Sequence, residues 1–393
     1  EIYLDGNSLG KLPLKTKKIL QKTIENQWGK RLIRSWNEKW LDLPTQLANK
    51  YGTLLGIKKE EILIGESTTV RLYQILYTLL KSNLFPNQLS SDNLNFPTDL
   101  YVVEGLNNEF NLNRVNLINY NQEIVADLNL LKKNIQNHQG IYCLSLVTYK
   151  SSFLYPMKEL NLWAKKNNSI IIWDLSHAIG SVEIDLIETQ SKIAIGCSYK
   201  YMNGGPGSPA FLFIEKKLQN HLNNPIQGWF GHKNPFDFEP NYKPNSSINK
   251  FASGTIPILS MQAMEAGVDL TLAAGIKNIR EKSVQLSGFF LDGIEKKLIQ
   301  LGFKVESPLN KDIRGSHLAI SHKASWQICQ DLIKGKSNSP QIIPDFRPPN
   351  LIRFGISPLY TSFEDLYLVI RRLEDIILTK SYQKFDKSKT TVT

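Results

Sequence analysis

Apolar and polar positions alternate with two different spacings along the first half of the chain. Helical periodicity marks three stretches: Lys15–Asn26, Leu43–Leu55 and Thr69–Lys81. Short apolar runs between and after them are typical of buried strands: Ile62–Ile64, Leu100–Val103, Ile141–Val147, Ile170–Trp173, Ile193–Cys197 and Ala210–Ile214. This alternation predicts an α/β fold with a mostly parallel, doubly wound sheet.

The second half of the chain changes its pattern. Residues from about Met261 to Leu301 are helical in spacing, and a further set of helices and strands is expected from Lys304 to Leu378. We therefore expect four parts: an N-terminal segment 1–50, a large domain 51–260, a helical connection with a small C-terminal α/β domain 261–379, and a flexible tail 380–393. Asparagine-rich stretches at 87–95 and in the 240s predict loops.

Composition narrows the class of protein. A chain of 393 residues with 41% hydrophobic and 21% charged residues can bury a large core and a smaller one. The net charge is +11, but lysines are spread from Lys11 to Lys389 without an arginine-rich stripe, so we expect a basic surface and no nucleic-acid partner. An anionic small substrate is compatible with this charge.

Neither targeting nor membrane insertion is indicated. The first residues show no basic and apolar leader, and no apolar run approaches the length of a membrane span. Because the chain starts without methionine, we expect residues to be missing before Glu1. Cys143, Cys197 and Cys329 lack metal-type spacing, so we expect reduced, buried thiols in a cytoplasmic protein and no metal site.

Two expected strands end in reactive groups. Asp174 and His177 follow one, while Tyr199 and Lys200 follow the next, ahead of a turn-rich Asn203–Gly207. Ligands of open parallel sheets bind beyond these strand ends. A lysine amine can form a Schiff base with pyridoxal phosphate, and a carboxylate can keep the pyridine nitrogen protonated. Alone, such an acid is usually a helix cap and such a lysine a surface charge; together they favour the cofactor.

A possible phosphate site lies earlier in the chain. Ser67, Thr68 and Thr69 precede a helix expected to start near Val70, so they offer hydroxyls and free backbone N–H groups. A helix N-cap would explain one hydroxyl, but it does not need three. We therefore favour a phosphate ligand here.

Seven stretches of the sequence resemble one known family. They are YLDGNSLG at 3–10, FPTD at 96–99, WDLSHAIG at 173–180, SYKYMNGGPGSP at 198–209, GWFGH at 228–232, GTIP at 254–257 and NLIRFGISPLY at 350–360. In this order they resemble kynureninase, a fold-type-I pyridoxal-phosphate enzyme of the aminotransferase class V superfamily. The resemblance implies a large domain with a seven-stranded, mostly parallel sheet that binds the cofactor. It also implies an N-terminal segment that lines the active site.

The resemblance implies roles for the residues around the cofactor ring. Lys200 would be the Schiff-base lysine and the base at the substrate Cα. Asp174 would face the pyridine nitrogen, and His177 would join the hydrogen bonds of the cofactor. Phe96 would stack on the ring and Asp99 would help to fix it.

Further roles follow for the phosphate and the ring hydroxyl. Thr68, Thr69 and Tyr199 would bind the phosphate, and Thr255 would also contact the cofactor. Trp229 would reach the phosphate of the partner subunit, because the resemblance implies a homodimer with active sites at the interface. Ser145 would lie near the hydroxyl side of the ring.

The remaining implied residues bind the amino-acid substrate. Arg353 would take the α-carboxylate, for which a guanidinium is well shaped; otherwise it would form a surface salt bridge. Trp36, Gly254 and Thr255 would shape the aromatic end of the pocket, although a tryptophan is as often simply buried. Tyr199 would relay a proton. The implied reaction is hydrolytic Cβ–Cγ cleavage of L-kynurenine or L-3-hydroxykynurenine to anthranilate or 3-hydroxyanthranilate and L-alanine, in tryptophan catabolism, the kynurenine pathway towards NAD.

One segment departs from the family pattern, and other functions stay open. Tyr149-Lys150-Ser151-Ser152 stands where a Tyr-Arg-Thr-Gly-like segment is expected, which affects local loop geometry. One alternative is a related lyase, epimerase or desulfurase acting on another amino acid. Another is a non-catalytic protein whose basic surface binds nucleic acid, although Lys200 and Asp174 argue against it. The choice between kynurenine and its 3-hydroxy derivative also stays open.

Overall fold

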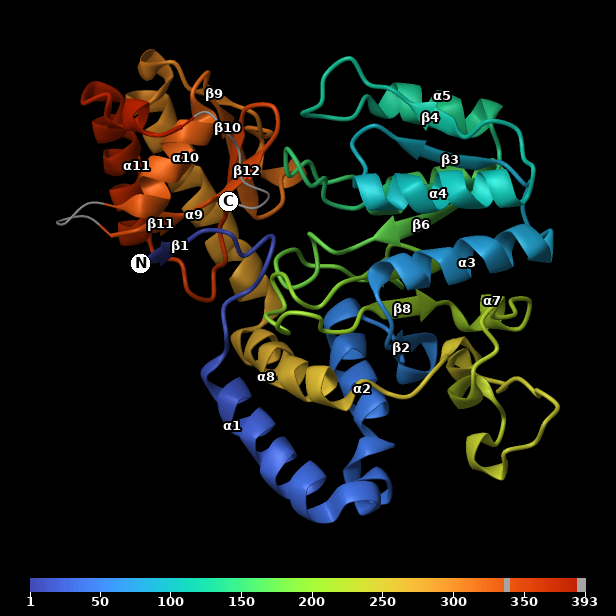
Figure 1. The fold of residues 1–393 in the computed structure, drawn as a ribbon. Helices are drawn as coiled ribbons and strands as arrows, with labels where there is room; N and C mark the ends of the chain where they lie inside the picture. The colour runs from blue at the N-terminus through green and yellow to red at the C-terminus, as the bar shows by residue number, and fades with distance from the viewer. Residues whose placement is uncertain (336–339, 387–393) are drawn as a thin grey trace.

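A mixed, mostly parallel sheet forms the centre of the larger half of the molecule (Figure 1). The computed structural model describes residues 1–335 and 340–386. Within these residues the sheet has seven strands, in the order β2 (Ile62–Ile64), β8 (Phe211–Ile214), β7 (Ile193–Gly196), β6 (Ile170–Asp174), β5 (Ile141–Ser145), β3 (Leu89–Asp92) and β4 (Asn116–Ile118). Strands β3 to β7 are parallel, while β8 runs antiparallel to both of its neighbours. The expected fold class is confirmed.

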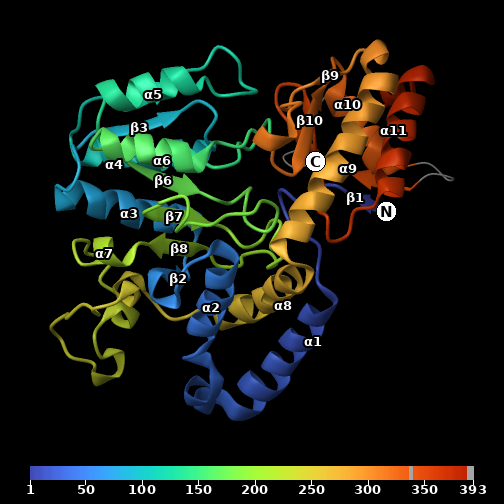
Figure 2. The same ribbon diagram turned by 180° about the vertical axis from the view of Figure 1, so that it is seen from behind.

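Helices cover both faces of this sheet. Figure 1 shows α3 (Thr68–Ser82) and α4 (Pro97–Glu109) in front of it, and Figure 2 shows α6 (Met157–Lys166) on the opposite face. Strand β6 is buried on both sides, because Ile170 and Ile172 join the core under α3 while Ile171 and Trp173 join the core under α6. The second face is also packed by α2 (Leu43–Leu55), α5 (Leu128–Asn137) and α8 (Ile258–Ala274).

A smaller sheet forms the C-terminal half. In the described residues it has four antiparallel strands, in the order β12 (Asp345–Arg347), β13 (Leu351–Gly355), β10 (His317–Ser321) and β9 (Lys304–Val305). Its core includes side chains of α9 (Ile276–Lys297), α10 (Ser325–Lys334) and α11 (Phe363–Leu378). The start of α11 is fixed by a capping box between Ser362 and Asp365.

The N-terminal segment joins the two halves. Strand β1 (Ile2–Tyr3) pairs in parallel with β11 (Ile342–Ile343) beside the small sheet. The chain then crosses to α1 (Leu14–Lys22), which packs along α8 and continues as a π-helical stretch, Thr23–Arg31. Strand β1 contacts the C-terminal half and α1 contacts the larger half, so residues 4–13 between them cross from one half to the other.

Helix prediction from periodicity is confirmed in the N-terminal half: α2 has the expected bounds, and α1 and α3 differ from expectation at their ends. The expected strand at Leu100–Val103 is wrong, because it lies inside α4. Pro97 begins that helix, and its buried residues Asp99, Val103, Leu106 and Asn107 follow a helical period. The four consecutive apolar or aromatic residues at 100–103 have the composition of a buried strand, which explains the wrong prediction.

The expected loop at 87–95 is also wrong in its central part, because β3 occupies Leu89–Asp92. Its serines are buried in the sheet with their hydroxyls paired: Ser91 Oγ donates to the Cys143 carbonyl at 2.7 Å, and Ser90 Oγ accepts from Asn116 at 3.1 Å. Strand β3 and its three-residue neighbour β4 were not predicted, because their polar residues are not typical of buried strands.

Two further expectations concern the chain as a whole. Of the expected tail, Ser381–Lys384 forms a 3₁₀ turn, and residues 387–393 lie outside the described residues. In the part of the chain that the structure describes, no helix has both the length and the apolar character that a membrane span requires.

Candidate active site

The carboxyl ends of three adjacent parallel strands supply the polar groups of one site. Ser145 and Asp174 are the last residues of β5 and β6 and stand opposite each other in the sheet register. Strand β7 is the next neighbour of β6, and Lys200 follows its end. The acid and the lysine therefore reach the same edge because their strands are adjacent.

A cavity of about 580 Å³ lies at this edge. Its lining includes the predicted residues Thr68, Thr69, Phe96, Asp99, Asp174, Tyr199, Lys200 and Thr255. These residues come from α3, α4, two strand ends and the segment before α8. Segments far apart in the chain thus contribute to one space large enough for a small organic ligand.

Lys200 is almost fully buried and contacts His177. The Nζ atom lies 3.1 Å from His177 Nε2 and 5.6 Å from the centre of the Phe96 ring. Burial lowers the pKa of Lys200, and burial together with the nearby Lys200 charge lowers the pKa of His177 well below its ordinary value. Both groups are therefore biased towards their neutral forms, and a neutral amine is the nucleophilic form of lysine.

Asp174 is fixed by the turn that follows its strand. Its Oδ1 accepts hydrogen bonds from the Ser176 hydroxyl at 2.6 Å and from the Ser176 backbone N–H at 2.9 Å. Burial raises the pKa of Asp174, while the charge of Lys200 opposes this rise. Asp99 is also buried, and its Oδ2 has no hydrogen-bond partner among the described residues. Burial and the neighbouring Asp174 raise the pKa of Asp99 well above its ordinary value.

The N-terminus of α3 opens onto the same cavity. The helix starts at Thr68, not near Val70, so Thr68 and Thr69 lie in its first turn and Ser67 is the N-cap. The Ser67 hydroxyl accepts from the Val70 N–H at 3.3 Å. The first backbone N–H groups have no acceptor within the helix, and with the two threonine hydroxyls they form a donor set suited to an anion.

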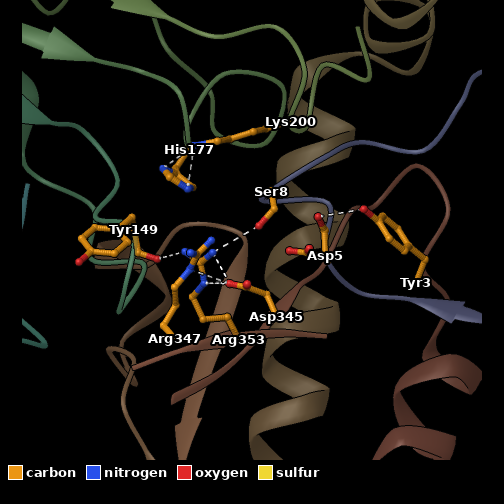
Figure 3. A network of polar contacts seen from close by, with 9 residues as sticks. All are labelled: Tyr3, Asp5, Ser8, Tyr149, His177, Lys200, Asp345, Arg347 and Arg353. Atoms are coloured by element: carbon orange, nitrogen blue, oxygen red, sulfur yellow. Dashed lines mark hydrogen bonds and ion pairs between the residues drawn. The ribbon is translucent and has the colours of Figure 1, made fainter. Parts of the chain in front are cut away.

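Arg353 stands on the small sheet and is only 1% exposed (Figure 3). Its Nε donates to Asp345 Oδ2 at 2.6 Å, its Nη1 donates to the Tyr149 carbonyl, and its Nη2 lies 3.4 Å from Ser8 Oγ. Figure 3 shows the guanidinium on the side of the network that faces His177 and Lys200. Arg353 is therefore an internally paired arginine, not the surface salt bridge that was its alternative.

Six predicted residues do not line the 580 Å³ cavity: His177 and Arg353, described above, and Ser145, Trp229, Trp36 and Gly254. Ser145 is buried and donates to Asn95 Oδ1 at 2.6 Å. Trp229 is 37% exposed and packs against the rings of Phe230, Phe236 and Phe238. Trp36 packs against Trp40 and Phe230. Gly254 lines a neighbouring cavity of about 220 Å³, and Thr255 lines both cavities.

Comparison with known proteins decides the family. A model of the kynureninase C-terminal domain matches residues 279–373, and the aminotransferase class-V model matches residues 2–323. Kynureninase from Pseudomonas fluorescens is 33% identical over 386 residues, which covers 97% of this chain and 90% of the relative. Kynureninase from Burkholderia pseudomallei is 33% identical over 387 residues with the same coverage. The chain belongs to the kynureninase family.

Solved structures support the same fold. A cysteine desulfurase from Thermococcus onnurineus has a TM-score of 0.79 at 15% identity and covers 96% of this chain and 95% of its own. The cystine C–S lyase C-DES has a TM-score of 0.80 at 15% identity, with 95% and 97% covered. Identity this low shows the fold alone. The kynureninase family and aminotransferase class V are dependent on pyridoxal phosphate.

The departure from the kynureninase family pattern lies beside Arg353. Ser152, where a glycine-like residue was expected, adopts a left-handed conformation with φ of +69° and is fully buried. Its Oγ accepts from the His317 N–H at 3.3 Å, and its carbonyl accepts from the Gly315 N–H at 2.7 Å. The loop therefore keeps its turn with a serine, and the serine side chain is used to join it to the small sheet.

Sequence reasoning missed several residues of this kynureninase-family site. Asp345 pairs with Arg353, and His317 is a buried ring whose centre lies 5.7 Å from that of His177. Neither ring nitrogen of His317 has a hydrogen-bond partner among the described residues. Gly10, within the quoted YLDGNSLG stretch, donates its N–H to the Tyr199 carbonyl at 2.7 Å. Asp345 lies opposite Arg353 in a β-hairpin. Sequence periodicity does not reveal this pairing, so no signal in the sequence pointed to Asp345.

Proposed function

We propose that this chain is a pyridoxal-phosphate-dependent kynureninase. It would cleave the Cβ–Cγ bond of L-kynurenine or L-3-hydroxykynurenine with water, giving anthranilate or 3-hydroxyanthranilate and L-alanine. The observation that carries the proposal is the meeting of Lys200, Asp174 and the N-terminus of α3 around one cavity, in a chain of the kynureninase family.

The residues present fit this cofactor. Asp99 Oδ2 and Ser208 Oγ are buried without hydrogen-bond partners in the described part of the chain, and both residues line the cavity. A polar ligand would satisfy these groups, which otherwise carry a desolvation cost. The donor set at the start of α3 suits a phosphate, and Asp174 suits a protonated ring nitrogen.

Each residue then has a defined task. When bound, the cofactor withdraws electrons from the substrate Cα. Lys200 takes the proton from Cα, and Asp174 holds the proton on the ring nitrogen. Arg353 binds the α-carboxylate and so orients the Cα–H bond. After water has added to the γ-carbonyl and the Cβ–Cγ bond has broken, Tyr199 supplies a proton to Cβ.

The proposal extends to assembly, location and pathway. A homodimer would bring Trp229 to the partner's phosphate site, which is compatible with its absence from the lining of the 580 Å³ cavity in its own chain. The three cysteines are free and buried, as expected for a cytoplasmic enzyme. Its reaction would serve tryptophan catabolism or the supply of anthranilate-type precursors, including those used for NAD. The domain division at residues 50, 260 and 379 is part of the same proposal.

Replacement of Lys200 tests the function. Wild-type protein loaded with pyridoxal phosphate should release fluorescent anthranilate from L-kynurenine, or 3-hydroxyanthranilate from the hydroxylated substrate, and Lys200→Ala should release neither. Lys192→Ala is a matched control, because Lys192 pairs with Glu215 at the opposite end of β7. Full activity in Lys200→Ala would contradict the assignment of this lysine. Cofactor absorbance in wild-type protein without cleavage of either substrate would point to another amino acid.

A further inference from the structure

The hairpin formed by β12 and β13 places three charged side chains on one face of the small sheet. Asp345 stands directly opposite Arg353 in the antiparallel register, so their side chains are cross-strand neighbours. Arg347 lies two residues after Asp345 and therefore projects to the same side of its strand. Backbone pairing thus brings one carboxylate next to two guanidinium groups (Figure 3).

Asp345 occupies one edge of the Arg353 guanidinium. Oδ2 accepts from Nε at 2.6 Å and also pairs with Nη2. The other contacts lie at the opposite end of the group, where Nη1 donates to the Tyr149 carbonyl and Nη2 lies 3.4 Å from Ser8 Oγ. The Nε edge is therefore closed by Asp345. A ligand carboxylate would bind at the Nη1–Nη2 end, where it would replace the long contact of Nη2 with Ser8 Oγ.

Because Arg353 and Asp345 are buried, their ion pair favours one orientation of the Arg353 guanidinium. The side chains of Arg353 and Asp345 are 1% and 6% exposed, whereas Arg347 is 36% exposed and holds the same Oδ2 from 3.0 Å. A buried guanidinium that lost its carboxylate partner would be an uncompensated charge, so it would turn towards other acceptors. The more exposed Arg347 forms a second ion pair with Asp345 and so helps to fix the position of its carboxylate.

We propose that Asp345 is a positioning residue that fixes the Nε edge of Arg353 and so presents the Nη1–Nη2 end to the α-carboxylate of the substrate. Through this contact it sets the preference of the enzyme for amino acids that carry that carboxylate. The inference rests on the proposed amino-acid substrate, but it does not depend on which bond the enzyme cleaves.

Asp345→Asn tests the proposal in the holoenzyme. The amide keeps the size of the side chain and one acceptor oxygen but loses the charge that fixes the guanidinium. We expect binding of L-alanine, followed through the change that it causes in cofactor absorbance, to weaken about tenfold, as for one charge-assisted hydrogen bond. The KM for L-kynurenine should rise by a similar factor while kcat changes little, because the lost interaction is with the carboxylate and not with the reacting bond.

Asp331→Asn is the matched control. Asp331 also forms a buried pair with an arginine, Arg372, in the small domain, with side chains 5% and 3% exposed. It should lower the free energy of unfolding and leave L-alanine affinity unchanged. An equal loss of affinity in Asp331→Asn would overturn the proposal, because the effect would then follow from a general loss of stability.

A double-mutant cycle separates an effect through Arg353 from any other route. In an Arg353→Lys background, Asp345→Asn should weaken L-alanine binding much less than it does in wild type. A full effect in that background would overturn the positioning role. If Asp345→Asn does not fold, Asp345→Glu serves instead, because it keeps the charge but displaces the Nε edge; unchanged L-alanine affinity in Asp345→Glu would equally overturn the proposal.

The same titrations distinguish this inference from the proposed function. A wild-type protein that binds L-alanine but cleaves neither kynurenine would overturn the proposed function and still show whether Asp345 governs carboxylate binding. A wild-type protein whose cofactor absorbance responds to neither L-alanine nor L-kynurenine would overturn both.

Discussion

Burial sets the protonation of individual side chains around the cavity. It raises the pKa of Asp99 and Asp174 and lowers the pKa of His177 and Lys200. Each shift favours the neutral form, because a charge loses hydration when it is buried. The same effect that makes these residues costly for stability prepares Lys200 to act as a nucleophile and a base.

Asp92 provides a test of this effect away from the chemistry. It is 1% exposed, and its Oδ2 accepts from the Tyr155 hydroxyl at 2.6 Å. Burial raises its pKa from 3.8 to about 6. The folded protein therefore holds this proton more tightly than the unfolded chain does, and the stabilisation present at low pH is lost as the pH rises from about 4 to about 6, to a total of about 3 kcal/mol.

Asp92→Asn should remove this dependence on pH. Wild type should lose stability as the pH increases from 4.5 to 7, because Asp92 ionises in the core, whereas the variant has no carboxylate there. The free energy of unfolding of the variant minus that of wild type is therefore expected to increase over this range. Urea denaturation of both proteins at the two pH values measures the difference. A difference that stays the same at both pH values would show that Asp92 does not titrate in this range.

At the scale of elements, two glycines hold the loop that carries Lys200. A Cβ at Gly10 would lie 2.3 Å from the Lys200 carbonyl oxygen, and a Cβ at Gly267 in α8 would lie 2.1 Å from the Met202 carbonyl oxygen. The N-terminal segment and α8 thus approach the loop more closely than any side chain permits. The position of Lys200 therefore depends on these two contacts as well as on β7.

Gly267→Ala should destabilise the protein by about 2 kcal/mol, because backbone atoms on both sides must move to admit the methyl group. The matched control is Gly288→Ala in α9, where a Cβ would meet nothing within 4 Å. There alanine should add about 0.5–1 kcal/mol of stability through its higher helix propensity. Thermal or urea unfolding of both variants measures the contrast, and equal effects of the two substitutions would contradict the packing argument.

Elements could be predicted where local pattern and tertiary context agree. The amphipathic period of α2 gave its bounds, and the apolar runs of β6 and β7 placed Asp174 and Lys200 at neighbouring strand ends. Strand β3 was missed because its residues are polar, and the distant groups that pair with them in the core, such as the Cys143 carbonyl, cannot be read from the local pattern. Asp345 was missed for the same reason: its role depends on a strand register.

At the scale of the whole molecule, an exposed aromatic cluster lies on the segment between β8 and α8. Trp229, Phe236 and Phe238 are 37%, 49% and 74% exposed, and the rings of Phe236 and Phe238 lie 5.5 and 6.1 Å from that of Trp229. A group of exposed aromatic side chains is typical of an interface. The proposed homodimer would cover this cluster and bring Trp229 to the partner's phosphate site.

Trp229→Ala should therefore weaken cofactor retention. Loss of one aromatic contact is expected to raise the dissociation constant for pyridoxal phosphate about tenfold, which corresponds to about 1.4 kcal/mol. The cofactor is titrated into apoprotein by absorbance, and light scattering reports the mass in the same samples. Phe289→Ala is the control, since Phe289 is equally exposed but lies on α9. Unchanged cofactor affinity in a Trp229→Ala dimer would contradict the contact between subunits, and a wild-type monomer that retains the cofactor tightly would contradict the dimer itself.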